Sequence, residues 1–157
     1  MSLITQPTQY RPCAGMMLLN HEGNVLVGKR IDSSANAWQM PQGGIDEGEE
    51  IEAAALRELR EEIGTDKVEI ITRSRDWHYY DLPENLIGTL WNGQYRGQKQ
   101  IWFLMRFLGN DDEININTHH PEFSDVKWVA VDEVPQLIVS FKKDLYEQVI
   151  AEFRPYL

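Results

Sequence analysis

The sequence has one cysteine among its 157 residues, Cys13. A single cysteine cannot form an internal disulfide bond, which excludes the disulfide-stabilised secreted domains and agrees with a reducing compartment. Because Cys13 stands in an apolar run, we expect a buried, inert thiol rather than a nucleophile. No apolar run approaches the roughly 20 residues of a membrane span, and the opening MSLITQPTQY lacks the basic and apolar regions of a signal peptide. We therefore expect a cytoplasmic protein with no membrane partner.

Basic residues are also scarce, since 15 Lys and Arg stand against 25 Asp and Glu and give a net charge of −10. This balance argues against a broad basic surface for nucleic acid, so no DNA partner is expected. It leaves room for a small basic pocket that reads one phosphorylated end. With 42% hydrophobic and 10% aromatic residues, the chain is expected to fold as one domain over residues 1–157, with residues 1–9 as a loose arm.

The apolar patterns predict strands and helices in alternation. The expected strands cover residues 13–19, 25–30, 38–41, 98–108 and 126–131, and a β-like stretch at 68–71 continues through 73–80. Loops are expected at 31–37, 83–97 and 111–121, and a helical turn at 132–133 that Pro135 interrupts. A closing amphipathic helix is expected over 142–153, with Leu145, Val149 and Phe153 on one face. This order suggests a mixed sheet between helices, an α/β/α sandwich, although spacing does not reveal the strand order.

The stretch from Gly43 to Thr65 predicts a helix that follows a Gly-rich acidic loop and ends at Gly64. At about 100° per residue, one apolar stripe is formed by four residues: Ile51, Ala55, Leu59 and Ile63. Glu58, Glu61 and Glu62 also gather on one side of this helix. Glu62 falls inside the apolar sector and Glu58 at its border, where carboxylates repel one another and resist desolvation. A hard divalent cation with oxygen ligands would offset that cost.

An ordinary charged helix is the alternative interpretation of these acids, with Arg57 and Glu61 as an i,i+4 pair. An acidic cluster taken alone is more often such a surface. The position of Glu62 and the preceding Gly-rich loop favour the cation site. Elsewhere, no His or Cys arrangement has zinc spacing, and His119 and His120 are expected in an exposed loop.

This stretch resembles the Nudix box, G-x5-E-x7-R-E-U-x-E-E-x-G-U. The matching residues are Gly43, Glu49, Arg57, Glu58, Leu59, Glu61, Glu62 and Gly64, and only Thr65 departs from the pattern. The resemblance implies the Nudix α/β/α fold and a Mg²⁺-dependent hydrolase, with Mn²⁺ as a possible substitute. It implies Glu58 and Glu62 as the main metal ligands, assisted by the Gly43 carbonyl. Glu61 would share the metal site or act as general base, and Arg57 would orient Glu49.

Further segments are similar to one subgroup, the bacterial RNA 5′-pyrophosphohydrolases and the related diadenosine tetraphosphate hydrolases. These segments are residues 10–12, 38–44, 80–83, 97–100, 102–103, 121–123 and 140–142. The likeness implies Glu122 as a further metal ligand or base. It also implies substrate-binding residues, with phosphate contacts from the cations and base contacts from the aromatic rings: Arg11, Arg30, Tyr80, Gln98, Phe141 and Lys142.

Each of these residues also has a simpler interpretation. Arg11 could be a surface charge, and Phe141 could anchor the last helix instead of stacking on a base. Gln98 and Gln100 alternate with apolar neighbours, a pattern that favours side chains facing solvent. Trp102 is typical of a core residue.

Three functions remain open from the sequence. The first is hydrolysis of a phosphoanhydride bond in 5′-triphosphorylated RNA or in a dinucleoside tetraphosphate. The second is a housekeeping Nudix pyrophosphatase for small nucleotides, such as dNTPs or ADP-ribose. The third is a non-catalytic module that binds RNA ends, which the complete set of carboxylates disfavours. The sequence does not identify protein partners.

Overall fold

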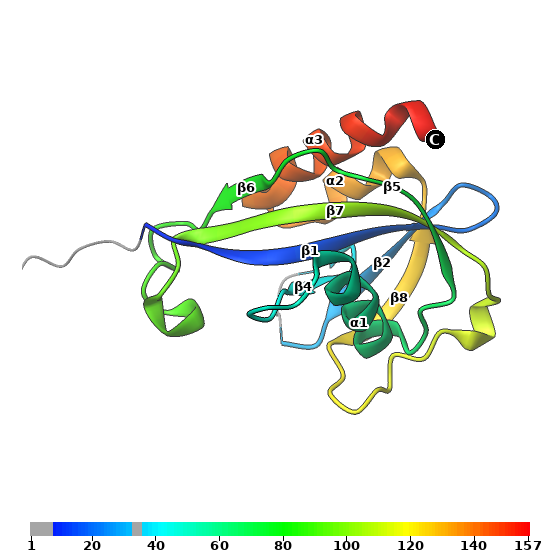
Figure 1. Cartoon of the computed structure of the whole chain (residues 1–157), viewed down its shortest axis with the longest axis horizontal. Coiled ribbons are helices and arrows are strands. Elements are labelled where there is room, and N and C mark those ends of the chain that lie inside the picture. Colours follow the sequence, from blue (N-terminus) through cyan, green and yellow to red (C-terminus); the bar gives the residue numbers. More distant parts are fainter. Residues whose placement is uncertain (1–7, 33–35) are drawn as a thin grey trace, which may run out of the picture.

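The structure is a computed structural model that describes residues 8–32 and 36–157. In this part of the chain an eight-stranded mixed sheet runs through the molecule (Figure 1). The strands are β1 Tyr10–Leu19, β2 Val25–Arg30, β3 Trp38–Gln39, β4 Gln42–Gly44, β5 Val68–Arg73, β6 His78–Asp81, β7 Gly97–Phe107 and β8 Phe123–Val129. Their order is β3-β2-β1-β7-β5, while β4 pairs with β1, β6 with β7 and β8 with β2.

The two long strands β1 and β7 form the centre of the sheet. They run parallel in register from Tyr10 opposite Gly97 to Leu19 opposite Arg106, and every other pairing is antiparallel. Both are nearly continuous apolar runs, as expected for strands that are covered on both faces. The predicted strands at 13–19 and 98–108 are therefore confirmed, and β1 begins three residues earlier than predicted.

Helices cover both faces of the sheet, which confirms the predicted α/β/α architecture. Helix α1 (Ile51–Ile63) lies on one face, and α2 (Val134–Leu137) and α3 (Lys143–Phe153) lie on the other (Figure 1). The core on the α1 side includes Ala55, Leu59 and Ile63. The core on the α3 side includes the predicted apolar face of α3, whose residues Leu145, Val149 and Phe153 are buried. Trp102 is fully buried there, as predicted.

Helix α1 ends where the sequence predicts. Gly64 adopts a left-handed conformation with φ 77°, and its backbone N–H donates to the Arg60 carbonyl. An added side chain at Gly64 would also collide with the backbone of Asn115. Glycine is therefore required at this position for two reasons, its left-handed backbone conformation and the short distance to the Asn115 backbone. The cap fixes the end of α1, and with it the turn that carries Glu58 and Glu62.

Four local predictions are wrong. Residues 42–44 form strand β4 rather than the start of a loop, because their backbone pairs with β1. The predicted stretch 68–80 is two strands, because regular pairing with β7 stops after Arg73. The Ser74 backbone N–H still donates to the Trp102 carbonyl, but the Ser74 hydroxyl accepts the backbone N–H of Trp102. Strand β8 starts at Phe123, three residues before the predicted start at 126. Pro135 stands in the first turn of α2, where its missing N–H costs nothing, so it opens the helix rather than interrupting one.

Residues 1–7 of the predicted N-terminal arm and residues 33–35 of the predicted loop 31–37 lie outside the described residues. Cys13 is fully buried, and burial raises the pKa of its thiol to about 11, which agrees with the inert cysteine predicted from the sequence. Among the described residues there is no helix both long enough and apolar enough to span a bilayer.

Candidate active site

Three carboxylates from two distant segments meet beside the sheet. Glu58 and Glu62 lie one turn apart on α1 and are 8% and 0% exposed. Glu122 immediately precedes β8, and its half-buried side chain faces the same point. One oxygen of each residue lies within 4.8 Å of the other two. The structure therefore brings together three of the predicted metal ligands, across 60 residues of sequence between Glu62 and Glu122.

The acid cluster is electrostatically unfavourable without a counter-charge. Burial, followed by the nearby charges of Glu122 and Glu58, raises the pKa of Glu62 well above its ordinary value. Burial also raises the pKa of Glu58, although Arg57 acts in the opposite direction. One Glu62 oxygen accepts the backbone N–H of Gln42 at 3.1 Å, while the other is buried without a partner in the described part of the chain. An unpartnered carboxylate oxygen facing two further carboxylates fits a divalent cation with oxygen ligands.

Arg57 connects the acids of the helix to the loop before it. Its guanidinium forms two hydrogen bonds to Glu49, at 2.8 and 2.9 Å, and a third to the Gly44 carbonyl. It also donates to Glu58 at 3.0 Å and to Glu61 at 3.2 Å. The hydrogen bonds from Arg57 lower the pKa of Glu49 to about 2. The predicted contact between Arg57 and Glu49 is thus confirmed, and it holds the loop against α1.

Glu61 lies apart from the other acids. Its side chain is 53% exposed and its ion pair with Arg57 keeps it on the solvent side of the helix. It therefore has the geometry of the i,i+4 pair that the sequence offered as an alternative, next to a site that three other carboxylates form. Its role as a metal ligand or general base stays a prediction.

Gly43 lies directly against the Glu58 carboxylate. A side chain added at Gly43 would overlap the Glu58 carboxyl group, so only glycine permits this approach of strand β4 to helix α1. The Gly43 backbone is thereby held at the edge of the acid cluster, where its carbonyl is predicted to be a ligand.

Cationic side chains stand around the same point. The Arg11 guanidinium lies against Gly44, and Arg30 lies 3.7 Å from Glu122 while it binds Asp32 through two hydrogen bonds of 2.8 Å. Lys142 is half-buried, and desolvation lowers the pKa of its ammonium to about 8. Within the described residues, Arg11 and Lys142 form no ion pair with a carboxylate, so their charges remain available to an anion.

The aromatic residues predicted to flank a base contact each other. The ring centroids of Tyr80 and Phe141 are 5.9 Å apart, and the Lys142 ammonium lies 5.2 Å from the Tyr80 ring. Phe141 also packs against the α3-side core. Both interpretations of Phe141 therefore fit the structure, an anchor for the last helix and an aromatic wall of the site.

The floor beneath Tyr80 is a buried chain of polar side chains. The Gln100 amide donates to Gln98 at 2.6 Å and to Gln42 at 3.5 Å, and its oxygen accepts the indole N–H of Trp102 at 2.9 Å. Gln98 and Gln100 are 2% and 1% exposed, so the expectation that they face solvent is wrong. Most residues on both faces of β7 are buried, so the alternation of its residues does not distinguish a solvent face from a site.

Gln42, Gln100 and Asp32 have no site role among the sequence predictions. The available signal was the presence of two glutamines inside an otherwise apolar central strand, since buried amides need partners. Asp32, two residues after Arg30, carries no comparable signal.

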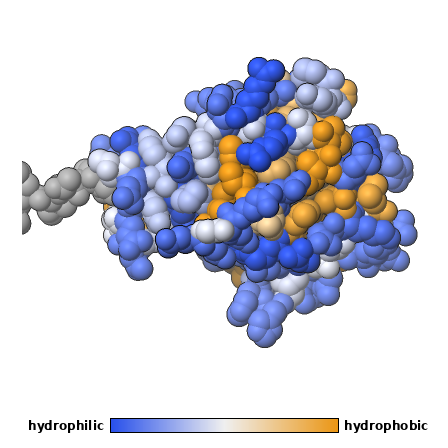
Figure 2. Space-filling view, in the orientation of Figure 1, coloured by the Kyte–Doolittle hydropathy of each residue, from blue (hydrophilic) through white to orange (hydrophobic). Residues whose placement is uncertain are grey.

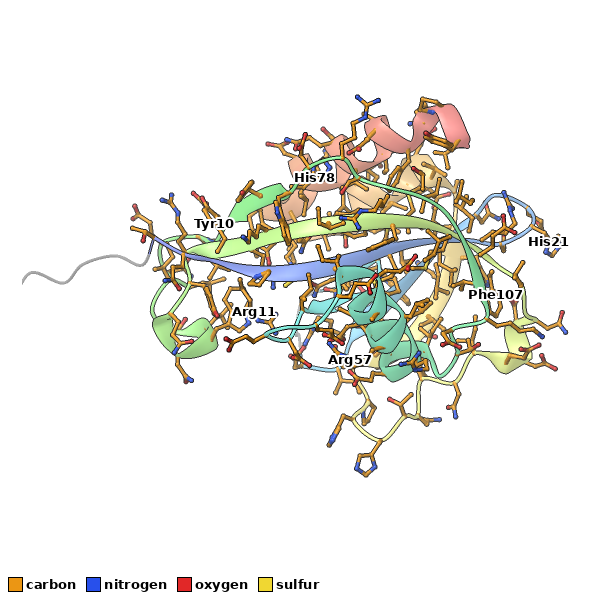
Figure 3. All side chains as sticks on the ribbon, viewed as in Figure 1. Tyr10, Arg11, His21, Arg57, His78 and Phe107 are labelled. Carbon is orange, nitrogen blue, oxygen red and sulfur yellow. The ribbon has the colours of Figure 1, made fainter. Side chains whose placement is uncertain are left out.

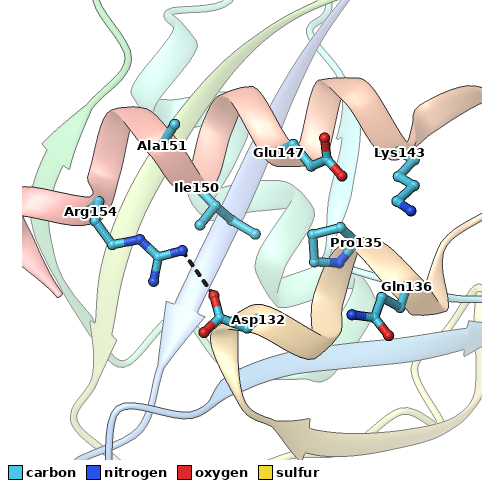
Figure 4. Close-up of a pocket in the computed structure, with 8 residues that line it drawn as sticks. All are labelled: Asp132, Pro135, Gln136, Lys143, Glu147, Ile150, Ala151 and Arg154. Atoms are coloured by element: carbon cyan, nitrogen blue, oxygen red, sulfur yellow. Dashed lines mark hydrogen bonds and ion pairs between the residues drawn. The ribbon is translucent and has the colours of Figure 1, made fainter.

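A separate cleft of about 490 Å³ lies between α2 and α3, on the other face of the sheet (Figure 4). It is bridged by an ion pair of 2.9 Å between Arg154 and Asp132, and Pro135 and Ile150 lie between them and Lys143. None of the predicted site residues lines this cleft. His119 and His120 are exposed, as predicted, in the loop before Glu122.

Comparison with known proteins identifies the family of this chain. Residues 9–149 match the family model of the NUDIX domain. The RNA pyrophosphohydrolase of Sphingopyxis alaskensis is 58% identical over 148 residues, which cover 93% of this chain and 94% of that protein. The RNA pyrophosphohydrolase of Wolbachia sp. subsp. Drosophila simulans (strain wRi) is 55% identical, with 96% of this chain and 93% of that protein covered. The Ap4A hydrolase of C. elegans, solved as a binary complex, has a TM-score of 0.66 at 18% identity, covering 92% of this chain and 98% of that chain.

Proposed function

Since the chain belongs to the Nudix hydrolase family, we propose that it cleaves a phosphoanhydride bond in 5′-triphosphorylated RNA or in a dinucleoside tetraphosphate. The observation that carries this proposal is the juxtaposition of the acid cluster Glu58, Glu62 and Glu122 with the cations Arg11 and Lys142, which have no carboxylate partner among the described residues. Relatives above 50% identity are named RNA pyrophosphohydrolases, which favours the RNA end as substrate. We also propose the cytoplasm as the compartment.

Glu58, Glu62 and Glu122 would hold Mg²⁺, or Mn²⁺ in its place, together with the Gly43 carbonyl. Such an ion supplies charge neutralisation at the phosphate oxygens and lowers the pKa of a bound water. Arg11, Arg30 and Lys142 would bind the remaining phosphate oxygens and orient the polyphosphate. Either Glu61 or Glu122 would take the proton of the attacking water, and the oxygen of this water would become part of the released phosphate or of the new 5′-monophosphate.

Arg57 positions the carboxylates and the loop before α1 and does not contact the substrate in this proposal. By binding Glu49, Glu58 and the Gly44 carbonyl together, it fixes the loop relative to α1. The acids are then in place before the substrate arrives, and no reorganisation is required during the reaction.

A substrate panel at fixed Mg²⁺ tests the proposal. We expect triphosphate-ended RNA to yield a monophosphate end with pyrophosphate or phosphate, and diadenosine tetraphosphate to be cut asymmetrically. Parallel reactions with dNTPs and ADP-ribose, and with the metal chelated, are the controls. Faster turnover of the small nucleotides would replace the proposal with the housekeeping function. The absence of product from every substrate would instead indicate a binding module.

A further inference from the structure

Strands β1, β6 and β7 continue past the start of α1, so within residues 8–32 and 36–157 no helix lies over one face of this end of the sheet (Figure 1). In β1, the even-numbered residues Ala14 and Met16 pack on the α1 side. By alternation, Tyr10 and Pro12 project to the same side. Lys99 lies opposite Pro12, and Tyr79 lies opposite Lys99, so four side chains from three strands share this face.

Aromatic rings dominate this face. The rings of Tyr10 and Tyr79 meet edge to face at 4.9 Å, and those of Trp91 and Tyr95 in the adjoining loop lie 6.2 Å apart. Tyr79 is 52% exposed, although a tyrosine of this size is normally buried to a larger extent in a strand. In Figure 2 this end of the molecule is pale to blue, and the orange apolar surface lies in the middle and towards the opposite end. The face therefore offers rings rather than aliphatic surface.

Cations are interleaved with these rings. The Lys99 ammonium lies 4.6 Å from the centre of the Trp77 ring on this face. Arg11 points from β1 towards the other face, where its guanidinium lies 5.6 Å from Trp91, but it also lines a cleft together with Trp77. Neither Lys99 nor Arg11 pairs with a carboxylate in the part of the chain that the structure describes. Figure 3 shows Arg11 at this end of the molecule, on the same strand as Tyr10. Aromatic rings alternating with unpaired cations are typical of surfaces that hold single-stranded nucleic acid.

Two adjoining clefts connect this face to the candidate active site. A cleft of about 600 Å³ runs from the loop at Gly44 and Glu49, past Arg11, to Trp77 and Tyr95. A second cleft, of about 410 Å³, continues along Tyr79 and Lys99 and shares Pro12 and Tyr95 with the first. Arg11 lies against Gly44 at the end of the first cleft that is nearer to the acid cluster. The track therefore begins at the predicted phosphate site.

We propose that this aromatic track, formed by Tyr10, Trp77, Tyr79, Tyr95 and Lys99, binds the nucleotides that follow the 5′ end of an RNA substrate. This inference rests on the proposed function, because it assigns the RNA end rather than the dinucleoside tetraphosphate as the substrate that fills the whole surface. Bases stack on the rings, and Lys99 meets a backbone phosphate. Asp46 and Glu47 line the first cleft and repel phosphates, so the bases rather than the backbone face the protein there.

Continuity with the site favours RNA over a protein as the occupant. An RNA whose first phosphates lie at Arg11 extends along the track without any further docking surface. A dinucleoside tetraphosphate ends at its second nucleoside, so it offers no third or fourth base to the track. The structure therefore predicts a dependence of turnover on RNA length, which a site limited to the first nucleotide would not show.

The test compares triphosphate-ended RNAs of two, four and twelve nucleotides that share the same 5′ sequence, with diadenosine tetraphosphate alongside. Because each stacked base strengthens binding, for the wild type we expect kcat/KM to rise about tenfold from the shortest to the longest RNA. Tyr79→Ala combined with Lys99→Ala should flatten this rise to less than about twofold. Hydrolysis of diadenosine tetraphosphate should remain at the wild-type rate, which also reports correct folding.

Matched controls separate stacking from general damage. Tyr79→Phe keeps the ring and should keep the length dependence. Tyr156→Ala removes a tyrosine of equal exposure, 53%, from the C-terminal segment, and Lys67→Ala removes an exposed lysine; neither should change it. Photo-crosslinking from 4-thiouridine at the third or fourth nucleotide should label residues 77–80 or Tyr95.

The possible contrary outcomes are distinct. A wild type whose rate is independent of RNA length, or a double variant that keeps the length dependence, overturns the inference. Equal losses on RNA and on diadenosine tetraphosphate also overturn it, since the face would then support the fold. A double variant that alters only self-association, measured by sedimentation, assigns the face to a protein partner. Failure to cleave RNA of any length, with diadenosine tetraphosphate still cleaved, rejects RNA as substrate in the proposed function itself.

Discussion

Both faces of the sheet bury polar groups near Gly43 and Gly44. The two faces differ in whether these groups have hydrogen-bond partners. On the α3 face, Gln100 satisfies its amide through Gln98, Gln42 and Trp102. On the α1 face, one oxygen of the fully buried Glu62 has no partner among the described residues. A satisfied network is rigid by itself, whereas an unsatisfied carboxylate cluster is complete only with a ligand. The first face is thus prepared to position a substrate and the second to bind a cation.

The largest expected effect comes from removing the negative charge of Glu62 on the α1 face. Glu62→Gln keeps the shape of the side chain but removes its charge, so kcat should fall by about a thousandfold, the loss typical of a group that stabilises the transition state. The fold should be retained, because a neutral amide is cheaper to bury than an unpaired carboxylate. Phosphate release and circular dichroism measure the two effects. Glu52→Gln, at an exposed position of the same helix, should be unaffected; equal activity in both variants would contradict the assignment of Glu62.

Divalent cations should stabilise the fold through the same cluster. A ligand that binds only the folded state adds about 2.7 kcal/mol to the free energy of unfolding at a concentration of 100 times its Kd. We therefore expect Mg²⁺ or Mn²⁺ to raise the Tm of the wild type and chelation to lower it. The Tm of Glu62→Gln should respond little. A Tm that is insensitive to metal in the wild type would show that the acids do not form an ion site.

A substitution in the glutamine network on the α3 face should lower the free energy of unfolding. Gln100→Leu leaves the Trp102 indole N–H and the Gln98 oxygen without partners, which costs about 1–3 kcal/mol. Denaturant unfolding measures this loss. Gln148→Leu, at an exposed position of α3, provides the matched control and should change stability by less than about 0.5 kcal/mol. Similar values for the two variants would indicate that the glutamine network is not a structural element.

The smallest expected effect is a pH dependence at Lys142. Because burial lowers the pKa of Lys142 to about 8 from 10.5, the folded protein binds fewer protons than the unfolded chain between these values. The free energy of unfolding should therefore rise with pH across this interval, and Lys142→Met should abolish the rise. Over the same interval the KM for a triphosphate end should increase as the ammonium loses its charge. Lys143→Met is the exposed neighbour that should leave both profiles unchanged.

The sequence predicts the α1 face better than the α3 face, for a physical reason. A helix repeats every 3.6 residues, so the position of Glu62 among Ala55, Leu59 and Ile63 can be calculated from spacing alone. Its full burial agrees with that calculation. On a central strand covered on both sides, alternation carries no information about solvent, and Gln98 and Gln100 were assigned to the wrong environment. The hydrophobic repeat of a helix or strand identifies its buried face only if the opposite face is exposed to water.

Local sequence patterns do not predict contacts between residues that are far apart in the sequence. Glu122 follows Pro121 in a loop, and only the family resemblance connected it with α1. Its meeting with Glu62 depends on how β8 pairs with β2 and on how β2 follows β1, information that no local window contains. The boundaries of β8 were misplaced for a related reason, since Val131 continues the apolar pattern beyond the point at which pairing with β2 ends at Val25.

The break between β5 and β6 has a consequence for the protein in concentrated solution. These two strands form one border of the sheet, and a long, straight border of unpaired N–H and C=O groups would recruit strands from other molecules. Ser74 interrupts this border, and a bulge between Ile70 and Thr72 bends it. Neither remaining segment is long and straight enough to template a neighbour. By accepting the backbone N–H of Trp102, the Ser74 hydroxyl thereby helps to protect the molecule from aggregation.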